Sequence, residues 1–160
     1  MSNNNGKNVS KKDRAAFIAK MRQARETCFA ILFEMTFTDD DYETILDNAV
    51  ESRLITADEY TVKVLEYYSK NKEAVDGMIK ANIKGWTFER LSRVPLSVMR
   101  LAICELNCCD TPESVVINEA IELTKKYAEP KESGFVNAVL GAVVRAGKNG
   151  KKESAGNEQN

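Results

Sequence analysis

The chain contains no histidine, only three prolines and eight glycines, and no long hydrophobic run. Without histidine, the commonest general base and one of the commonest metal ligands are missing, which disfavours most acid–base catalysis. No apolar run approaches the roughly 18 residues that a membrane span needs. The polar, basic segment 1–14 also lacks the apolar core of a secretory signal. We therefore expect a cytoplasmic protein that does not enter a membrane.

The four cysteines are few and irregularly spaced. Cys104 and Cys108 stand one helical turn apart, yet no second pair at the spacing of a zinc finger or ribbon accompanies them. A free cysteine packs as a small apolar residue, and disulfides are rare in the cytoplasm. We expect the cysteines to fill the core, and we expect no bound metal and no cofactor.

Charge divides the chain unevenly, although the net value is only −1. Residues 1–25 hold seven basic side chains and one acidic side chain, whereas the rest of the chain holds 16 basic and 23 acidic ones. A basic segment on an acidic body is typical of an arm that meets a polyanion. On charge alone, a solvated terminus that happens to be basic is an equally good explanation.

Apolar residues recur every three or four positions along most of the chain, which predicts helices, and no segment alternates like a strand. With 43% hydrophobic and 29% charged residues, the 160-residue chain has the composition and length of one globular domain. The sequence predicts an all-α bundle of about seven helices. The first runs from Lys12 to Phe37, the second ends at about residue 53, the third begins at Thr56 and the fourth runs from Asn71 to about Ile83. The fifth begins at Pro95, the sixth ends at Tyr127 and the last ends near Gly147. We expect a disordered basic tail over 1–11, a single domain over 12–147 and a flexible tail over 148–160.

The segment PLSVMRLAICELNCC, residues 95–109, is apolar on nearly every side. A helix without a wide polar face belongs at the centre of a bundle. Arg100 and Glu105 are the only charges in its middle. Because buried charges persist when they are paired, we expect both residues to form structural ion pairs with neighbouring helices.

One flank of the first predicted helix carries arginines between apolar side chains. At 100° per residue, Arg14, Arg22 and Arg25 share this flank with Phe29 and Phe33. Guanidinium groups contact phosphates and aromatic rings stack on unpaired bases, so the flank suits single-stranded RNA. The alternative is that the rings belong to the core. We favour the core for Phe29, whereas Phe33 lies further round the helix and is more open.

Four motifs stand at separate positions along the chain: RQARE (22–26), RLSRVPLSVMRLAICEL (90–106), INEAIELTKKY (117–127) and FVNAVL (135–140). In this order and spacing they resemble the NusB family of bacterial transcription antitermination factors, over essentially residues 12–145. The resemblance implies two packed helical subdomains and a non-catalytic function. It also implies binding to the boxA RNA of ribosomal-RNA operons, as a heterodimer with NusE, the free form of a small-subunit ribosomal protein. This assembly acts within the RNA polymerase antitermination complex.

Carried over by position, the family's arginine-rich RNA-binding motif falls on Arg22 and Arg25, with Lys20 and Arg14 as local supplements. Family members often have an unbroken arginine run, which Met21 interrupts here together with the glutamine that follows Arg22. The interruption bears on the affinity for RNA more than on the position of the site.

The family's Phe-Val-Asn motif maps to Phe135, Val136 and Asn137, and Ala138 takes the place of a common glycine. The resemblance suggests that Phe135 and Asn137 lie near the RNA surface. The alternative, a helix N-terminus packed on the core, stays open.

Two other functions are compatible with a helical chain of this kind. A NusB-like domain also forms the N-terminal part of some ribosomal-RNA methyltransferases, but the 160 residues contain no glycine-rich strand-to-helix loop for a cofactor. The second alternative is a helical interaction module or a homodimer that shields its own RNA surface. We favour RNA binding, with the acidic body attracting a basic ribosomal protein.

Overall fold

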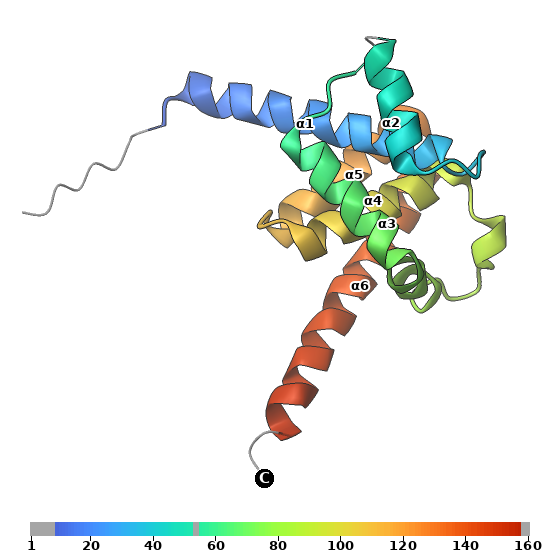
Figure 1. Ribbon diagram of the computed structural model, residues 1–160. Helices are drawn as coiled ribbons and strands as arrows, with labels where there is room; N and C mark the ends of the chain where they lie inside the picture. Colours follow the sequence, from blue (N-terminus) through green and yellow to red (C-terminus); the bar gives the residue numbers. More distant parts are fainter. Residues whose placement is uncertain (1–8, 53–54, 158–160) are drawn as a thin grey trace, which may run out of the picture.

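Helices account for most of the residues that the structure, a computed structural model, describes, namely 9–52 and 55–157. Six α-helices and one 3-10 helix follow each other without a strand in these ranges (Figure 1): α1 (Lys11–Glu34), α2 (Tyr42–Glu51), α3 (Glu59–Lys80), η1 (Phe88–Arg90), α4 (Arg93–Cys108), α5 (Glu113–Tyr127) and α6 (Pro130–Asn157). The prediction of an all-α fold is confirmed. None of the described helices combines the length and the hydropathy that crossing a membrane requires.

Short polar side chains begin three of the helices. Ser10, Asp41 and Asp58 each accept a hydrogen bond from the backbone N–H three residues further on. Each bond satisfies one of the donors that a helix start leaves without a partner. The N-cap of α3 is therefore Asp58. The sequence predicts the start of this helix two residues earlier, at Thr56.

One expected helix boundary is a kink inside α3. The sequence predicts a new helix from Asn71, but α3 continues through this residue, whose φ of −128° and ψ of 24° are not helical. The Asn71 amide donates a hydrogen bond to the carbonyl oxygen of Tyr67 at 2.9 Å, an example of a short polar side chain competing with the helical backbone. Two expected helices are thus one bent helix, which lowers the count from about seven to six in the described part of the chain.

The ends of the chain differ from the expectation. The prediction that the last helix ends near Gly147 is wrong, because α6 continues to Asn157. A glycine weakens a helix by roughly 1 kcal/mol, but it ends one only when it turns left-handed, and among the described glycines only Gly85 has a positive φ. Of the predicted disordered tail, residues 1–8 lie outside the described ranges, and Lys11 already begins α1. The end of the second helix near residue 53 also falls outside them.

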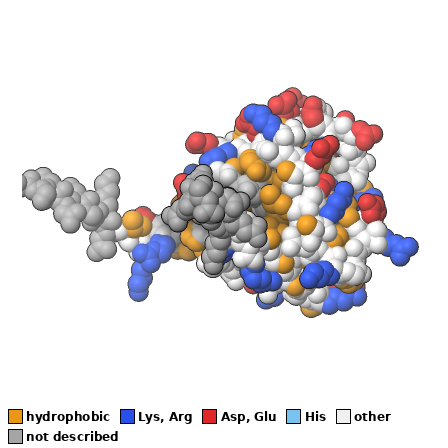
Figure 2. Space-filling model, turned by 90° about the horizontal axis from the view of Figure 1, so that it is seen from below, with side chains coloured by type: hydrophobic (Ala, Val, Ile, Leu, Met, Phe, Trp, Pro, Cys, Tyr) orange, Lys and Arg blue, Asp and Glu red, His pale blue; other side chains and the backbone are white. Residues whose placement is uncertain are grey.

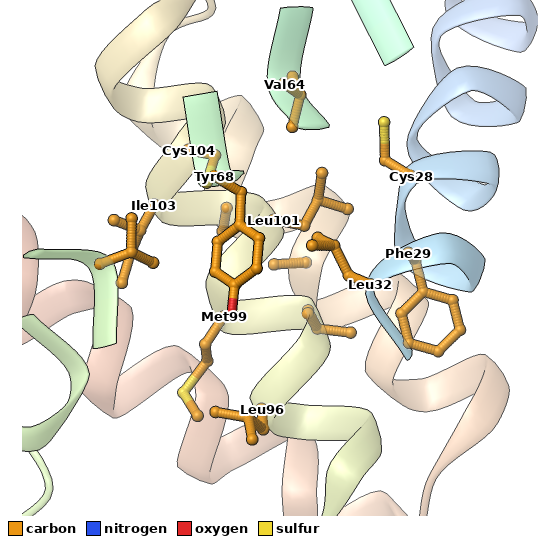
Figure 3. Packing of buried hydrophobic residues seen from close by; sticks show 14 of the residues in the cluster. Cys28, Phe29, Leu32, Val64, Tyr68, Leu96, Met99, Leu101, Ile103 and Cys104 are labelled. Atoms are coloured by element: carbon orange, nitrogen blue, oxygen red, sulfur yellow. The ribbon is translucent and has the colours of Figure 1, made fainter. Parts of the chain in front are cut away.

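The helices form two groups of three. α1, α2 and α3 contact one another, α4, α5 and α6 do the same, and α4 joins the groups by packing on α1 and α3. Figure 3 shows Leu32 of α1, Tyr68 of α3 and Met99 of α4 meeting in the shared core. Cys28 and Cys104 are completely buried there, as expected of core cysteines. Ten of the 16 residues of α4 are buried, which confirms its central position.

Two ion pairs tie α4 to its neighbours. The guanidinium of Arg25 on α1 donates to both carboxylate oxygens of Glu105, the shortest distance being 2.7 Å from Nη2 to Oε1. These side chains are only 7% and 1% exposed, and the hydroxyl of Thr111 donates a further bond to Glu105 at 3.0 Å. Arg100 binds Asp76 of α3 through two bonds of 2.8 and 3.0 Å. The predicted pairing of both charges is confirmed.

Replacing Glu105 by Leu is expected to lower the free energy of unfolding by about 3–5 kcal/mol, because Arg25 would remain buried without a partner. Urea unfolding measures this change. The double variant Arg25→Met/Glu105→Leu should recover most of the loss. The control Glu66→Gln, which breaks the exposed pair with Lys70, should change stability by about 0.5 kcal/mol or less. Equal urea midpoints for Glu105→Leu and Glu66→Gln would contradict the assigned role.

Candidate nucleic-acid interface

The N-terminal half of α1 extends away from the rest of the fold (Figure 1). Every residue from Lys11 to Lys20 is exposed, and the buried residues of the helix begin only at Ala24. Within the basic segment 1–25 predicted from the sequence, residues 11–21 therefore form a projecting helical arm. No part of the described chain encloses it, so its charges are open to a partner.

A groove of about 960 Å³, called the arm groove below, lies between α1 and the start of α5. The α1 side chains that line it are basic at both ends and apolar between them: Arg14, Phe17, Ile18, Met21, Arg22 and Arg25. The opposite wall comes from residues 110–119. Phe17 is 64% exposed, and Ile18 and Val115 are also largely open to solvent. The groove thus offers apolar surface next to cationic groups.

Arg22 is held at the edge of the arm groove by Glu119 of α5. Its Nε lies 3.2 Å from both carboxylate oxygens, while its side chain stays 58% exposed against 11% for Glu119. The hydrogen bond with Glu119 raises the pKa of the Arg22 guanidinium, which therefore stays charged. The cation is oriented by α5 and still accessible to a second anion.

Arg25 is not accessible in this way. Although its backbone lies on the same flank as Arg22, its side chain turns into the core and is fully engaged by Glu105. The structure therefore places Arg25 in the interior and not on the predicted RNA surface. The signal that could have indicated this was Glu105 itself, a carboxylate in an otherwise apolar helix that needed a cationic partner.

A second groove, of about 1120 Å³ and called the aromatic groove below, lies where the end of α1, the start of α4 and the α5–α6 junction meet. Its aromatic and basic lining comprises Phe33, Phe37, Trp86, Arg90, Arg93, Tyr127, Lys131 and Phe135. The rings of Phe33 and Phe37 lie 5.1 Å apart, and those of Trp86 and Phe135 lie 5.3 Å apart. The Arg93 guanidinium stands 4.2 Å above the ring of Phe37.

Three of these rings, Phe37, Trp86 and Tyr127, were not predicted from the sequence as site residues. Phe37 and Trp86 are 56% and 62% exposed, although large aromatic side chains are usually well buried. The available signal for Trp86 was the preceding Gly85, whose φ of 78° makes the turn after α3. A glycine turn followed by tryptophan brings the ring to the surface beside Phe135. Arg93 gave no such signal.

A surface cluster connects α1 and α5 between the two grooves. The Tyr127 hydroxyl and the Lys126 ammonium both donate to Glu26, the latter at 2.6 Å. Both bonds lower the pKa of the Glu26 carboxyl, and the bond from Lys126 has the larger effect. The Tyr127 ring also stacks on Phe29 at 5.0 Å. Phe29 is buried, as expected. This cluster fixes the spacing between the arm groove and the aromatic groove.

Apart from the buried Arg25, the predicted site residues separate into three sets. Arg14 and Arg22 line the arm groove, whereas Phe33 and Phe135 line the aromatic groove. Lys20 and Asn137 are exposed but line neither groove. Residues two positions apart in a helix point about 200° apart round its axis, so Lys20 faces away from Arg22.

Charge is also sorted over the surface. Viewed from the end of α6, acidic side chains gather mainly along the upper edge and several lysines and arginines along the lower edge, with hydrophobic side chains between them (Figure 2). A surface divided in this way can meet a polyanion at one edge and a basic partner at the other.

Comparison with known proteins identifies the family. The chain matches the NusB family over residues 22–145. It is 38% identical over 138 residues to the transcription antitermination protein NusB of Clostridium botulinum strain Loch Maree, covering 77% of this chain and 98% of that protein. The NusB protein of Acetivibrio thermocellus is 35% identical over 127 residues, covering 78% of this chain and 88% of the relative.

Solved structures agree with these relatives. Thermotoga maritima NusB superposes with a TM-score of 0.70 at 30% identity, covering 78% of this chain and 89% of that one. A crystal structure of the antitermination factors NusB and NusE in complex with double-stranded RNA gives a TM-score of 0.70 at 28% identity, covering 79% and 96%. The helical fold, the matched residues and the relatives together show that this chain belongs to the NusB family.

Proposed function

We propose that this chain is a non-catalytic transcription antitermination factor that binds boxA RNA of ribosomal-RNA operons as a heterodimer with NusE. It would act in the cytoplasm, within the RNA polymerase antitermination complex, with residues 12–147 as its RNA-binding domain. The observation that carries the proposal is the aromatic groove, in which exposed rings stand beside arginines. Unpaired bases stack on such rings while guanidinium groups contact the phosphates.

The two grooves have different tasks in this proposal. Arg22 contacts a phosphate in the arm groove, and Phe33, Trp86 and Phe135 stack on bases in the aromatic groove. Phosphate contacts position the strand, whereas contacts to bases specify it. The two grooves lie toward opposite ends of α1, so a strand that binds both runs along this helix.

The remaining predicted residues take other positions in the proposal. For Arg25 we propose a structural role in place of an RNA contact, because its guanidinium is buried against Glu105. Lys20 and Asn137 are exposed outside both grooves, and their contact with RNA stays a prediction.

Two observations support binding without catalysis. The curated Clostridium relative, covered over 98% of its length, is named an antitermination protein, which favours this function over a methyltransferase domain. Burial raises the pKa of the Cys108 thiol to about 12 and that of Cys104 as well. Thiols in that state are protonated at neutral pH and are poor nucleophiles.

The proposed function is tested by measuring boxA RNA affinity with and without NusE. NusE should tighten RNA binding, and by linkage the RNA should tighten NusE binding by the same factor. Fluorescence anisotropy with labelled boxA RNA measures the first effect, and a scrambled RNA of equal length is the control. A double-stranded form of the same sequence tests strandedness. Equal affinity for boxA and scrambled RNA in the presence of NusE would refute the proposal.

Arg22→Gln is expected to weaken RNA binding, because one phosphate contact is lost. The slope of log affinity against log salt should become less steep by about 0.7, the value for one phosphate of a single strand. Lys70→Gln serves as the control, since Lys70 is an exposed cation on α3 that lines neither groove. If both variants change the slope equally, Arg22 does not make a specific phosphate contact.

Trp86→Ala should weaken RNA binding by about 1–3 kcal/mol, the usual loss for one stacked base. The salt slope should not change, since no charge is removed. Val62→Ala removes another exposed apolar side chain, on α3 and outside both grooves, and should leave the affinity as it was. RNA titrations of the two variants in parallel measure these affinities. If Trp86→Ala binds RNA as tightly as the original chain, Trp86 does not contact the RNA.

A further inference from the structure

The projecting arm lies outside the part of the chain that matches the family. The match begins at residue 22, whereas α1 begins at Lys11 and is capped by Ser10. The Clostridium relative is covered over 98% of its own length by 77% of this chain. Residues 11–21 therefore add about three turns to α1 at 3.6 residues per turn.

Core packing does not explain the composition of this arm. All its residues from Lys11 to Lys20 are exposed, yet it carries Phe17 and Ile18 on the flank that faces the arm groove. A solvated extension without a partner has no need of an exposed phenylalanine. Short helices are marginal unless an apolar face is buried, so a ligand that covers Phe17 would also stabilise the arm.

We propose that the arm groove binds a stretch of single-stranded RNA next to the boxA element and so lengthens the RNA footprint of this chain. The inference rests on the proposed function and extends it. Arg14 and Arg22, about 12 Å apart along the helix, contact separate phosphates of one strand, and Phe17 stacks on a base between them. The 11 helical steps from Lys11 to Arg22 rise about 16 Å at 1.5 Å per residue. A stacked strand advances about 3.4 Å per nucleotide, which gives about five additional nucleotides.

Charge favours RNA over a second copy of the chain as the occupant. The arm holds four cations, Lys11, Lys12, Arg14 and Lys20, against a single acidic residue. In the arm groove, Glu119 is already neutralised by Arg22, which leaves Asp110 as the other acidic lining residue. Two copies that approach through this groove would bring two cationic arms together, whereas an RNA strand supplies phosphates at every nucleotide.

The test compares boxA RNA with the same RNA lengthened by about five nucleotides at its 5′ or its 3′ end. The full chain is titrated with each, and the readout is the ratio of the affinities for long and short RNA. One of the lengthened RNAs should bind about 5- to 150-fold tighter, the range for one stacked base. Phe17→Ala should bring this ratio close to one, and Arg14→Gln should make the salt slope of the long RNA less steep by about 0.7.

Lys12→Gln is the matched control. It removes an exposed charge from the same arm. Because Lys12 lies two helical positions from Arg14, it faces away from the groove, so the ratio of the affinities for long and short RNA should persist. A ratio of one in the original chain, a ratio kept in Phe17→Ala, or an equal loss in Lys12→Gln would each overturn the proposal. Sedimentation adds a further refuting outcome: a dimer of the free chain that Phe17→Ala dissociates would make a second copy the occupant. If boxA RNA binds no more tightly than scrambled RNA, the proposed function is refuted instead.

Discussion

The buried pair between Arg25 and Glu105 is the interaction on which the rest of the structure depends. It joins α1 to α4, the helix at the centre of the bundle, and through Thr111 it also holds the loop that leads into α5. Two of these segments, α1 and the loop, line the arm groove. An ion pair in the interior contributes little net stability compared with apolar packing, but these two buried charges are both satisfied only when Arg25 and Glu105 face each other. The register of α1 against α4 and α5 is thereby defined, and with it the position of every surface residue on α1.

This arrangement explains why neighbouring arginines of one motif differ in role. Arg22 and Arg25 are three positions apart and share a flank of α1, so periodicity alone assigns them to the same surface. The two lie 60° apart round the helix. That difference is enough to point Arg25 at Glu105 and Arg22 at the rim, where Glu119 meets it.

The sequence determines the fold class and the central helix well, because both follow from periodicity and from the lack of polar residues in 95–109. It also indicates that Arg100 and Glu105 need partners. It does not determine which residues meet across the bundle, since Trp86, Arg93 and Phe135 come from three separate segments that only tertiary packing assembles. Local choices such as the kink at Asn71 or the continuation of α6 past Gly147 depend on a side-chain hydrogen bond and on weak propensities that periodicity does not register.

The contact between Arg22 and Glu119 has a consequence for the chemistry of recognition. A phosphate that reaches Arg22 does not meet a vacant cation, because a carboxylate already occupies two of its donors. In the proposed complex a phosphate would bind the guanidinium donors that Glu119 leaves open, so the phosphate and the carboxylate would share Arg22 through charge-assisted bonds. Because Glu119 keeps its contact, the guanidinium is aimed before the proposed RNA strand arrives and still has a partner after the strand leaves.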